Sequence, residues 1–290
     1  DPVLSRGLGD VYKRQDLVGT GGDGANLFNV STAATFVAAA AGAQVAKHGN
    51  RSVSSSSGSS DVLETMGVNL DVSPEQIAAC VQEVGLGFMF APAHHGAMKH
   101  AVGPRRELGL RTLFNVLGPL TNPAGVKRQV LGVYDAGLCE PLAEVLARLG
   151  SEHALVIHSD DGLDEISIAA PTRGFELRAG DISPIEIDPA ALGLAHTSLD
   201  GLQVETAADS ANLIRGALAG DDDAVSIKAR AIIALNAGAG IYVSGVVESF
   251  ASGVAAAEQA MASGVAAQKL EAFVAFTQAL VSEQGGAFAS

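Results

Sequence analysis

The sequence has little cysteine and few aromatic residues. Its 290 residues include two cysteines, no tryptophan and 4% aromatic residues in all. The cysteines, Cys80 and Cys139, form no CxxC pair, and neither has a histidine or a second cysteine close by in the sequence. This excludes a disulfide framework and the common zinc motifs. We expect two reduced thiols in the core of a cytoplasmic protein.

Positive charge is also scarce. Lys and Arg number 18 against 32 Asp and Glu, which gives a formal net charge of −14. Such a surface repels nucleic acid and anionic lipid, so we expect no nucleic-acid partner. A local group of backbone N–H donors, a few cations and a metal ion can still bind an anionic metabolite. No signal-peptide pattern and no apolar run of roughly 18 residues is evident, so we expect no membrane segment.

The first 15 residues have neither helical nor strand periodicity. They read DPVLSRGLGDVYKRQ and join abruptly to the strand-like segment that begins at Asp16. We hypothesise that residues 1–15 are a non-native or unrelated prefix and that residues 16–290 form one α/β catalytic domain. The flanking genomic sequence tests this: coding sequence continuous with the prefix would contradict it.

The rest of the chain alternates strand and helix patterns, typical of an α/β domain. Strands without helices between residues 166 and 187 predict a mixed sheet, and Ala-rich helices are expected from 207 to 280. Ser31-Thr32 are expected to open a helix, and Ser73 to Gln76 match a capping box with proline at the first helical position. We further expect strands at 16–18, 43–46, 88–90, 129–134 and 154–158, and helices between about 93 and 117.

Two loops in this pattern suit a phosphate group. Gly19 to Gly24 (GTGGDG) lies between a strand and a helix, where glycines allow close approach and the helix N-terminus offers free N–H groups. Its spacing matches neither GxGxxG nor the P-loop, so neither a dinucleotide nor ATP is implied. Lys47 to Arg51 (KHGNR) and the following serine and glycine residues place a cation and many hydroxyls after a second strand. An ordinary turn and a solvated linker are the alternatives.

Two further segments carry charged groups suited to ligands. Asp160 to Glu165 (DDGLDE) follows a strand and offers hard oxygen ligands for Mg²⁺, the alternative being an acidic turn. His94 to His100 (HHGAMKH) and Arg105-Arg106 lie on a predicted helix. Their spacing fits no zinc motif, although an arginine there would suit an aromatic carboxylate. A solvated helix face explains the same residues.

Together these four motifs resemble anthranilate phosphoribosyltransferase, from Asp16 to about the C-terminus. The quoted segments are DLVGTGGDGANLFNVST at 16–32, the run from Lys47 to Asp61, His94 to Pro123 and Asp161 to Glu165. The resemblance implies a mixed-sheet α/β large domain of the nucleoside phosphorylase and phosphoribosyltransferase type. It also implies a small helical domain that is largely missing at the N-terminus. In that family a homodimer forms, and 5-phosphoribosyl 1-pyrophosphate (PRPP) and anthranilate give N-(5-phosphoribosyl)anthranilate and pyrophosphate in tryptophan biosynthesis.

The resemblance also assigns roles to residues. It implies Mg²⁺, as two ions with PRPP, held by Ser31, Asp164 and Glu165, and anthranilate held by Gly19, Asn50, His95 and Arg105. With no dedicated acid or base, the transition state would be held by Lys47, Arg105, Asp164 and Glu165. The residues implied for PRPP are Gly19, Gly22, Asp23, Asn29, Val30, Ser31, Thr32, Lys47, His48, Gly49, Asn50, Arg51, Ser52, Val53, Ser54, Ser55 and Ser59.

Two departures and two alternatives accompany this interpretation. Leu27 stands where such enzymes commonly have threonine, and residues 1–15 stand where the family has helices.

A pyrimidine nucleoside phosphorylase shares the expected fold, but free phosphate requires neither the acidic pair nor KHGNR. A nucleic-acid-binding relative of the same fold should be basic along one face, which the composition disfavours.

Overall fold

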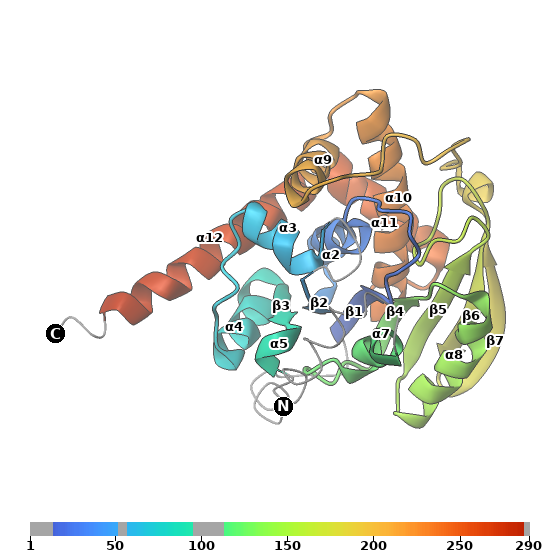
Figure 1. Ribbon diagram of the computed structural model, residues 1–290, viewed down its shortest axis with the longest axis horizontal. Helices are drawn as coiled ribbons and strands as arrows, with labels where there is room; N and C mark the ends of the chain where they lie inside the picture. Colours follow the sequence, from blue (N-terminus) through green and yellow to red (C-terminus); the bar gives the residue numbers. More distant parts are fainter. Residues whose placement is uncertain (1–13, 52–56, 95–112, 287–290) are drawn as a thin grey trace.

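A seven-stranded sheet forms the centre of the molecule (Figure 1). The computed structural model describes residues 14–51, 57–94 and 113–286. The sheet has the strand order β3-β2-β1-β4-β5-β6-β7. The first five strands in that order are parallel, and β6 and β7 are antiparallel, so the predicted mixed sheet is confirmed. The strands are β1 (Arg14–Gly19), β2 (Gln44–Gly49), β3 (Leu86–Phe90), β4 (Arg128–Gly132), β5 (His153–Ser159), β6 (Thr172–Arg178) and β7 (Asp181–Ile187).

Helices cover both faces of the sheet. On one face α2 and α10 contribute to the largest apolar cluster, together with residues of α9, α11 and α12. On the other face α8 packs on β5 and β6, and Ile77 of α4 packs with Ala46 and Met89. The helices are α2 (Val30–Ala40), α3 (Ser59–Thr65), α4 (Pro74–Val84), α5 (Ala91–His94), α7 (Leu113–Leu117), α8 (Cys139–Arg148), α9 (Ala207–Ala219), α10 (Ala224–Ser244), α11 (Phe250–Ala262) and α12 (Val265–Gly286).

Helix α10 corrects the expectation that no segment is long and apolar enough to cross a membrane. By length and composition alone it could do so, but 72% of its apolar window is buried inside the protein. It packs against α2, α11 and β4, as expected of the central helix of a large core. Cys80 and Cys139 are both buried and free, as predicted.

Several element boundaries match the sequence patterns, and others do not. The Ala-rich helices appear at the predicted positions, and Ser73 and Gln76 form the predicted capping box at the start of α4. Between 93 and 117, only α5 and α7 lie in the described ranges, because residues 95–112 are outside them. Strand β2 continues to Gly49, beyond the expected end at Ala46, because every residue from Val45 to Gly49 pairs with β3.

The first described strand begins two residues earlier than expected. Residues 1–13 of the hypothesised prefix lie outside the described residues, but Arg14 and Gln15 belong to β1 and pair with β2. Both side chains are buried, and burial lowers the pKa of the Arg14 guanidinium. The side-chain amide of Gln15 lies against Gly240 of α10 and has no hydrogen-bond partner among the described residues. This buried amide should oppose folding.

Replacing Gln15 by leucine is therefore expected to stabilise the protein. The substitution Gln15→Leu keeps a similar volume and removes an uncompensated amide, which should raise the free energy of unfolding by roughly 1–3 kcal/mol. The measurement is the midpoint of urea unfolding. Gln129→Leu on β4 is the matched control, because the buried Gln129 amide donates to Pro119 O at 2.8 Å and its loss should destabilise the protein. A lower midpoint for Gln15→Leu would contradict the expectation.

Candidate functional site

The candidate site lies at the carboxyl edge of the parallel strands. After β1 the chain builds β2 and β3 on one side, and it later returns to add β4 and β5 on the other. The strand order therefore reverses between β1 and β4, and in open α/β sheets ligands bind at such a point. The loop after β1 and the turn after β5 both open there, which brings together two of the four sequence motifs.

The glycine-rich loop follows β1 directly. Gly21, Gly22 and Gly24 have positive φ angles of 64°, 79° and 80°, a backbone conformation that favours glycine. The N–H of Gly21 donates to Asp164 Oδ2 at 2.6 Å across 143 residues of sequence. The predicted loop and the predicted acidic segment are thus in direct contact, which an ordinary turn would not require.

The second carboxylate of the pair lies at the N-terminus of α2. Glu165 Oε1 accepts from Ser31 N at 3.2 Å, so this carboxylate interacts with the positive end of the helix. The expectation that Ser31 and Thr32 open the helix is wrong in detail. Helix α2 begins at Val30, its N-cap residue Asn29 makes no side-chain cap bond, and the Thr32 side chain is buried.

Burial and mutual repulsion perturb this acidic pair. Burial and the nearby charge of Asp23 raise the pKa of Asp164 to about 7. Burial and the charge of Asp164 raise the pKa of Glu165 to about 8, although Lys47 acts in the opposite direction. A divalent cation would offset this repulsion, and carboxylate and hydroxyl oxygens are the hard ligands that Mg²⁺ uses beside substrate phosphates.

The protein donors for such an ion are few. In the described part of the chain no group of three or more His, Cys, Asp or Glu side chains could hold a metal by itself. Asp164, Glu165 and the Ser31 hydroxyl therefore suit an ion that takes its remaining ligands from water and from a bound phosphate. Mg²⁺ is commonly held in this way, with only one or two protein carboxylates.

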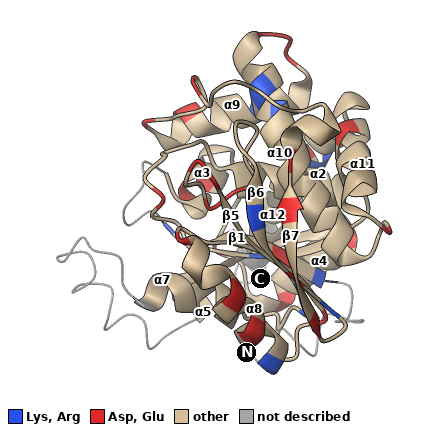
Figure 2. Cartoon of the chain, turned by 90° about the vertical axis from the view of Figure 1, so that its right-hand side faces the viewer, with Lys and Arg blue, Asp and Glu red and all other residues tan. Residues whose placement is uncertain are grey.

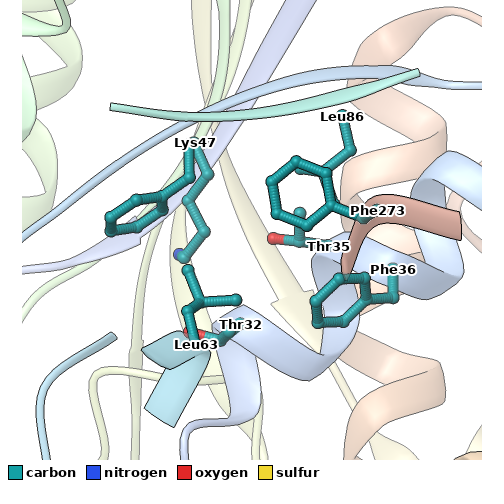
Figure 3. Close-up of a pocket in the computed structure, with 8 residues that line it drawn as sticks. Thr32, Thr35, Phe36, Lys47, Leu63, Leu86 and Phe273 are labelled. Atoms are coloured by element: carbon teal, nitrogen blue, oxygen red, sulfur yellow. The ribbon is translucent and has the colours of Figure 1, made fainter. Parts of the chain in front are cut away.

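Lys47 lies in β2, and not in the loop where the sequence pattern placed it. Its side chain is 3% exposed, and Nζ donates to Leu17 O at 2.5 Å and to Ser31 Oγ at 3.2 Å. Figure 3 shows the side chain reaching from β2 towards Thr32 and Leu63, beside a cavity of about 10 Å³. Lys47 thus joins the sheet to the first turn of α2.

The residues after β2 approach α3 and the start of α2. Ser59 Oγ donates to Asn50 O at 3.3 Å, so the first residue of α3 bonds to the residue that follows β2. The Arg51 guanidinium pairs with Asp61 and Glu64 of α3 at 2.9 and 2.7 Å. Arg51 was predicted to bind PRPP, but in the structure its positive charge is paired with these two carboxylates. Ser52 to Ser55, predicted for PRPP, lie outside the described residues.

The residues predicted for anthranilate are only partly described. Gly19 ends β1, and a Cβ at that position would lie 2.4 Å from Asp164 Oδ2. Asn50 is exposed just after β2, and the His48 side chain before it is buried. His95 and Arg105 lie outside the described residues.

Two residues at this edge were not found from the sequence. Gly132 ends β4, and a Cβ there would lie 1.6 Å from Asp164 O, so only glycine lets the acidic turn cross the strand. Ser210 of α9 is fully buried. Its Oγ accepts from Asn29 N at 2.9 Å and donates to Asn29 Oδ1 at 2.7 Å. Neither position belongs to a recognisable motif, because each matters only through a contact that is distant in sequence.

The Ser210 contact orients Asn29. With Oδ1 bonded to Ser210, the Asn29 amide nitrogen donates to Ser57 O at 3.0 Å and holds the end of the serine-rich segment beside α2. We predict that Ser210→Ala raises the KM for the expected phosphorylated substrate, PRPP, about tenfold and leaves the KM for the expected acceptor, anthranilate, unchanged, because a misplaced group at the site costs binding energy. Steady-state kinetics measure both constants. Ser226→Ala on α10 is a control of similar burial, and equal effects of the two substitutions would contradict the prediction.

Comparison with known proteins agrees with this geometry. Residues 12–267 match the model of the glycosyl transferase family, a/b domain. An anthranilate phosphoribosyltransferase from Teredinibacter turnerae is 63% identical over 262 residues, which are 90% of this chain and 77% of that protein. One from Cellvibrio japonicus is 60% identical over 271 residues, 93% of this chain and 79% of that protein.

Solved structures of similar proteins share the fold. An anthranilate phosphoribosyltransferase from Thermus thermophilus superposes with a TM-score of 0.84 at 43% identity, covering 92% of this chain and 78% of that one. The enzyme from Saccharomyces cerevisiae in complex with PRPP and Mg has a TM-score of 0.80 at 29% identity, covering 92% and 74%.

The fold and the acidic, glycine-lined sheet edge define a transferase of the glycosyl transferase α/β class. Within that class, the chain belongs to the anthranilate phosphoribosyltransferase family.

Proposed function

We propose that the carboxyl edge of β1, β2 and β5 holds PRPP together with Mg²⁺. As a member of its family, the chain transfers the 5-phosphoribosyl group of PRPP to the amino group of anthranilate and releases pyrophosphate, a step of tryptophan biosynthesis. The observation that carries the site assignment is the double contact of the acidic turn. Asp164 bonds to the glycine-rich loop, and Glu165 bonds to the first turn of α2.

The site residues suit ionisation of the bond between ribose and pyrophosphate. Bound Mg²⁺ would neutralise charge that develops on the pyrophosphate leaving group. The glycine-rich loop and the start of α2 lie beside the acidic turn, and their N–H groups at Gly21 and Ser31 donate to Asp164 and Glu165. Other backbone donors of the loop would stabilise negative charge that develops on a bound phosphate. Lys47 lies beneath the start of α2, where its Nζ donates to Ser31 Oγ. The amino group of anthranilate is neutral and can attack without prior deprotonation, and the proton that it loses after the C–N bond forms can pass to water or to the released pyrophosphate. Positioning of the two substrates should provide much of the acceleration.

The remaining assignments rest on the resemblance and are part of the proposal. They are two Mg²⁺ ions with PRPP, anthranilate contacts from Gly19, Asn50, His95 and Arg105, a homodimer, and a cytoplasmic location. The scarcity of Lys and Arg supports the absence of a nucleic-acid partner. Among the residues that the structure describes, Figure 2 shows Lys and Arg on several different elements.

A fluorescence assay tests the reaction directly. Anthranilate fluorescence is expected to fall when PRPP and Mg²⁺ are both added to the protein, and to stay constant when Mg²⁺ is chelated. Thymidine with inorganic phosphate serves as the comparison, because a pyrimidine nucleoside phosphorylase would consume it. Consumption of thymidine with unchanged anthranilate fluorescence would overturn the proposal.

Mg²⁺ binding is expected to weaken as the pH falls. The pKa values of about 7 and about 8 for Asp164 and Glu165 lie above those of ordinary carboxyl groups, so at lower pH Mg²⁺ must displace protons. In the unfolded chain both groups ionise near their ordinary pKa values. Between about pH 4 and 8 the folded, metal-free protein therefore holds more protons, and this contribution to stability falls as the pH rises.

Thermal melting measures this linkage. Mg²⁺ is expected to raise the melting temperature more at pH 8 than at pH 6, and Asp164→Ala with Glu165→Ala should abolish the difference. Equal shifts at the two pH values would show that the pair does not bind the ion.

A further inference from the structure

Strands β1 and β2 are neighbours in the sheet, but they separate after two paired positions. Their backbone register covers only Arg14↔Gln44 and Gln15↔Val45, although each strand has six residues. Each of the two strands stays paired with its other neighbour. Strand β2 pairs with β3 as far as Gly49↔Phe90, and β1 pairs with β4 as far as Gly19↔Gly132. The separation is therefore local to the interval in which Lys47 lies.

Side chains take over the backbone bonds in this interval. Asp16 Oδ1 accepts from His48 N at 3.3 Å, and Asp16 Oδ2 accepts from Asn122 Nδ2 at 2.8 Å. The same Asn122 nitrogen donates to Ala46 O at 2.9 Å. The backbone groups on both sides of Lys47 are thus held by one carboxylate and one amide. We call Asp16 and Asn122 the strand clamp.

The space that the strand clamp keeps open is used by Lys47. Its Nζ reaches across the interval to Leu17 O of β1 and continues to Ser31 Oγ at the start of α2. Asp16 and Lys47 are both buried, and a lone ammonium group in a protein interior is strongly disfavoured. Burial lowers the pKa of the Lys47 ammonium group, and the charges of Asp16 and Glu165 oppose that shift. Asp16 therefore acts on Lys47 through the backbone geometry of β2.

We propose that Asp16, assisted by Asn122, is a positioning residue that sets the place of Lys47 beneath the phosphate site. The proposal rests on the proposed function, in which Lys47 supports bound PRPP. Asp16 itself touches neither substrate, because it is fully buried between the strands.

Kinetics of Asp16→Asn test the proposal. The substitution keeps the size of the side chain but leaves one acceptor oxygen in place of the two that bond to His48 N and Asn122 Nδ2. We expect kcat/KM for PRPP to fall about 100-fold, the loss typical of a displaced group at a site. The KM for anthranilate should stay within about twofold, and the melting temperature within about 5 °C. Asn122→Ala, which leaves all charges in place, should lower kcat/KM for PRPP about tenfold.

The matched control is Gln129→Leu. Gln129 pairs with Asp16 in the register of β1 and β4 and is also buried, but its amide bonds to Pro119 O and not to β2. We expect this variant to lose stability and to keep its kinetic constants, the reverse of Asp16→Asn. If Asp16→Asn retains kinetic constants within about twofold of the unmodified protein, the proposal is overturned.

Amide hydrogen exchange gives a test that needs no substrate. Asp16→Ala removes the acceptor of the His48 N–H, so exchange at His48 should accelerate at least about tenfold while exchange in β4 and β5 is unchanged. Unchanged protection at His48 would overturn the strand clamp. If the unmodified protein does not convert anthranilate, the proposed function fails, whereas the exchange result still decides whether the clamp exists.

Discussion

Removing both carboxylates of the acidic turn should reduce Mg²⁺-dependent turnover by about 1,000-fold or more. In the double variant Asp164→Ala with Glu165→Ala, the pyrophosphate leaving group loses the ion that would offset its charge, and electrostatic terms of this kind are among the largest in catalysis. The fold should survive, because two buried carboxyl groups with raised pKa values favour the folded state little. We expect an unchanged or higher melting temperature in the absence of Mg²⁺.

The neighbouring residue Asp160 provides the control. It lies in the same acidic segment, but its side chain is exposed and pairs with Arg173 of β6. Asp160→Asn should keep full turnover and full Mg²⁺ dependence, which separates an effect of the pair from a general loss of negative charge. Turnover of the double variant within tenfold of the unmodified protein would refute the assignment of Asp164 and Glu165 to the metal.

Substituting Gly132 by alanine should disable the site without touching a ligand. The new Cβ would meet the backbone of Asp164, with the carbonyl oxygen at 1.6 Å and the carbonyl carbon at 2.6 Å. A backbone clash cannot be relieved by rotating a side chain, so the acidic turn must move away from β1 and β4. Displacement by about 1 Å can cost about 100-fold in rate. We expect that loss in kcat/KM and a destabilisation of about 3 kcal/mol, at the upper end of common single substitutions.

Gly118→Ala is the matched control for this substitution. A Cβ at Gly118 would meet no atom within 4 Å, so the change should alter neither stability nor turnover appreciably. Steady-state kinetics and urea unfolding measure both quantities for both variants. Full activity of Gly132→Ala would show that the acidic turn can lie elsewhere and still bind the ion.

The sequence was most informative where a motif is local. The mixed sheet, the capping box of α4 and the Ala-rich helices follow from periodicity and from residues three or four apart. The glycine-rich loop and the acidic turn were also found as separate segments. Their contact could only be inferred from the rule that the carboxyl ends of parallel strands meet at one edge.

The parts that were missed depend on contacts between distant segments. Lys47 looked like a loop residue, because the KHGNR pattern is polar and the buried neighbours of β2 were unknown. Ser31 and Thr32 looked like helix caps, but a carboxylate from 134 residues away bonds to the N–H of Ser31. Asn122 lies in the quoted run from His94 to Pro123, but no role was assigned to it. Ser210 and Gly132 carry no local signal, since serine and glycine at single positions are common in any chain.

The bond between Ser210 and Asn29 has a consequence for the order in which the protein matures. These residues are 181 positions apart, and the segment before Ser210 also pairs with the chain before Asn29, through Phe28 N to Leu202 O and Val204 N to Asn26 O. During synthesis the glycine-rich loop leaves the ribosome long before α9 exists, and contacts of such long range form slowly. A nascent chain that stops before about residue 210 would present its phosphate loop without its final support. We therefore expect competence to bind substrate only after the chain has been made to about Ser210.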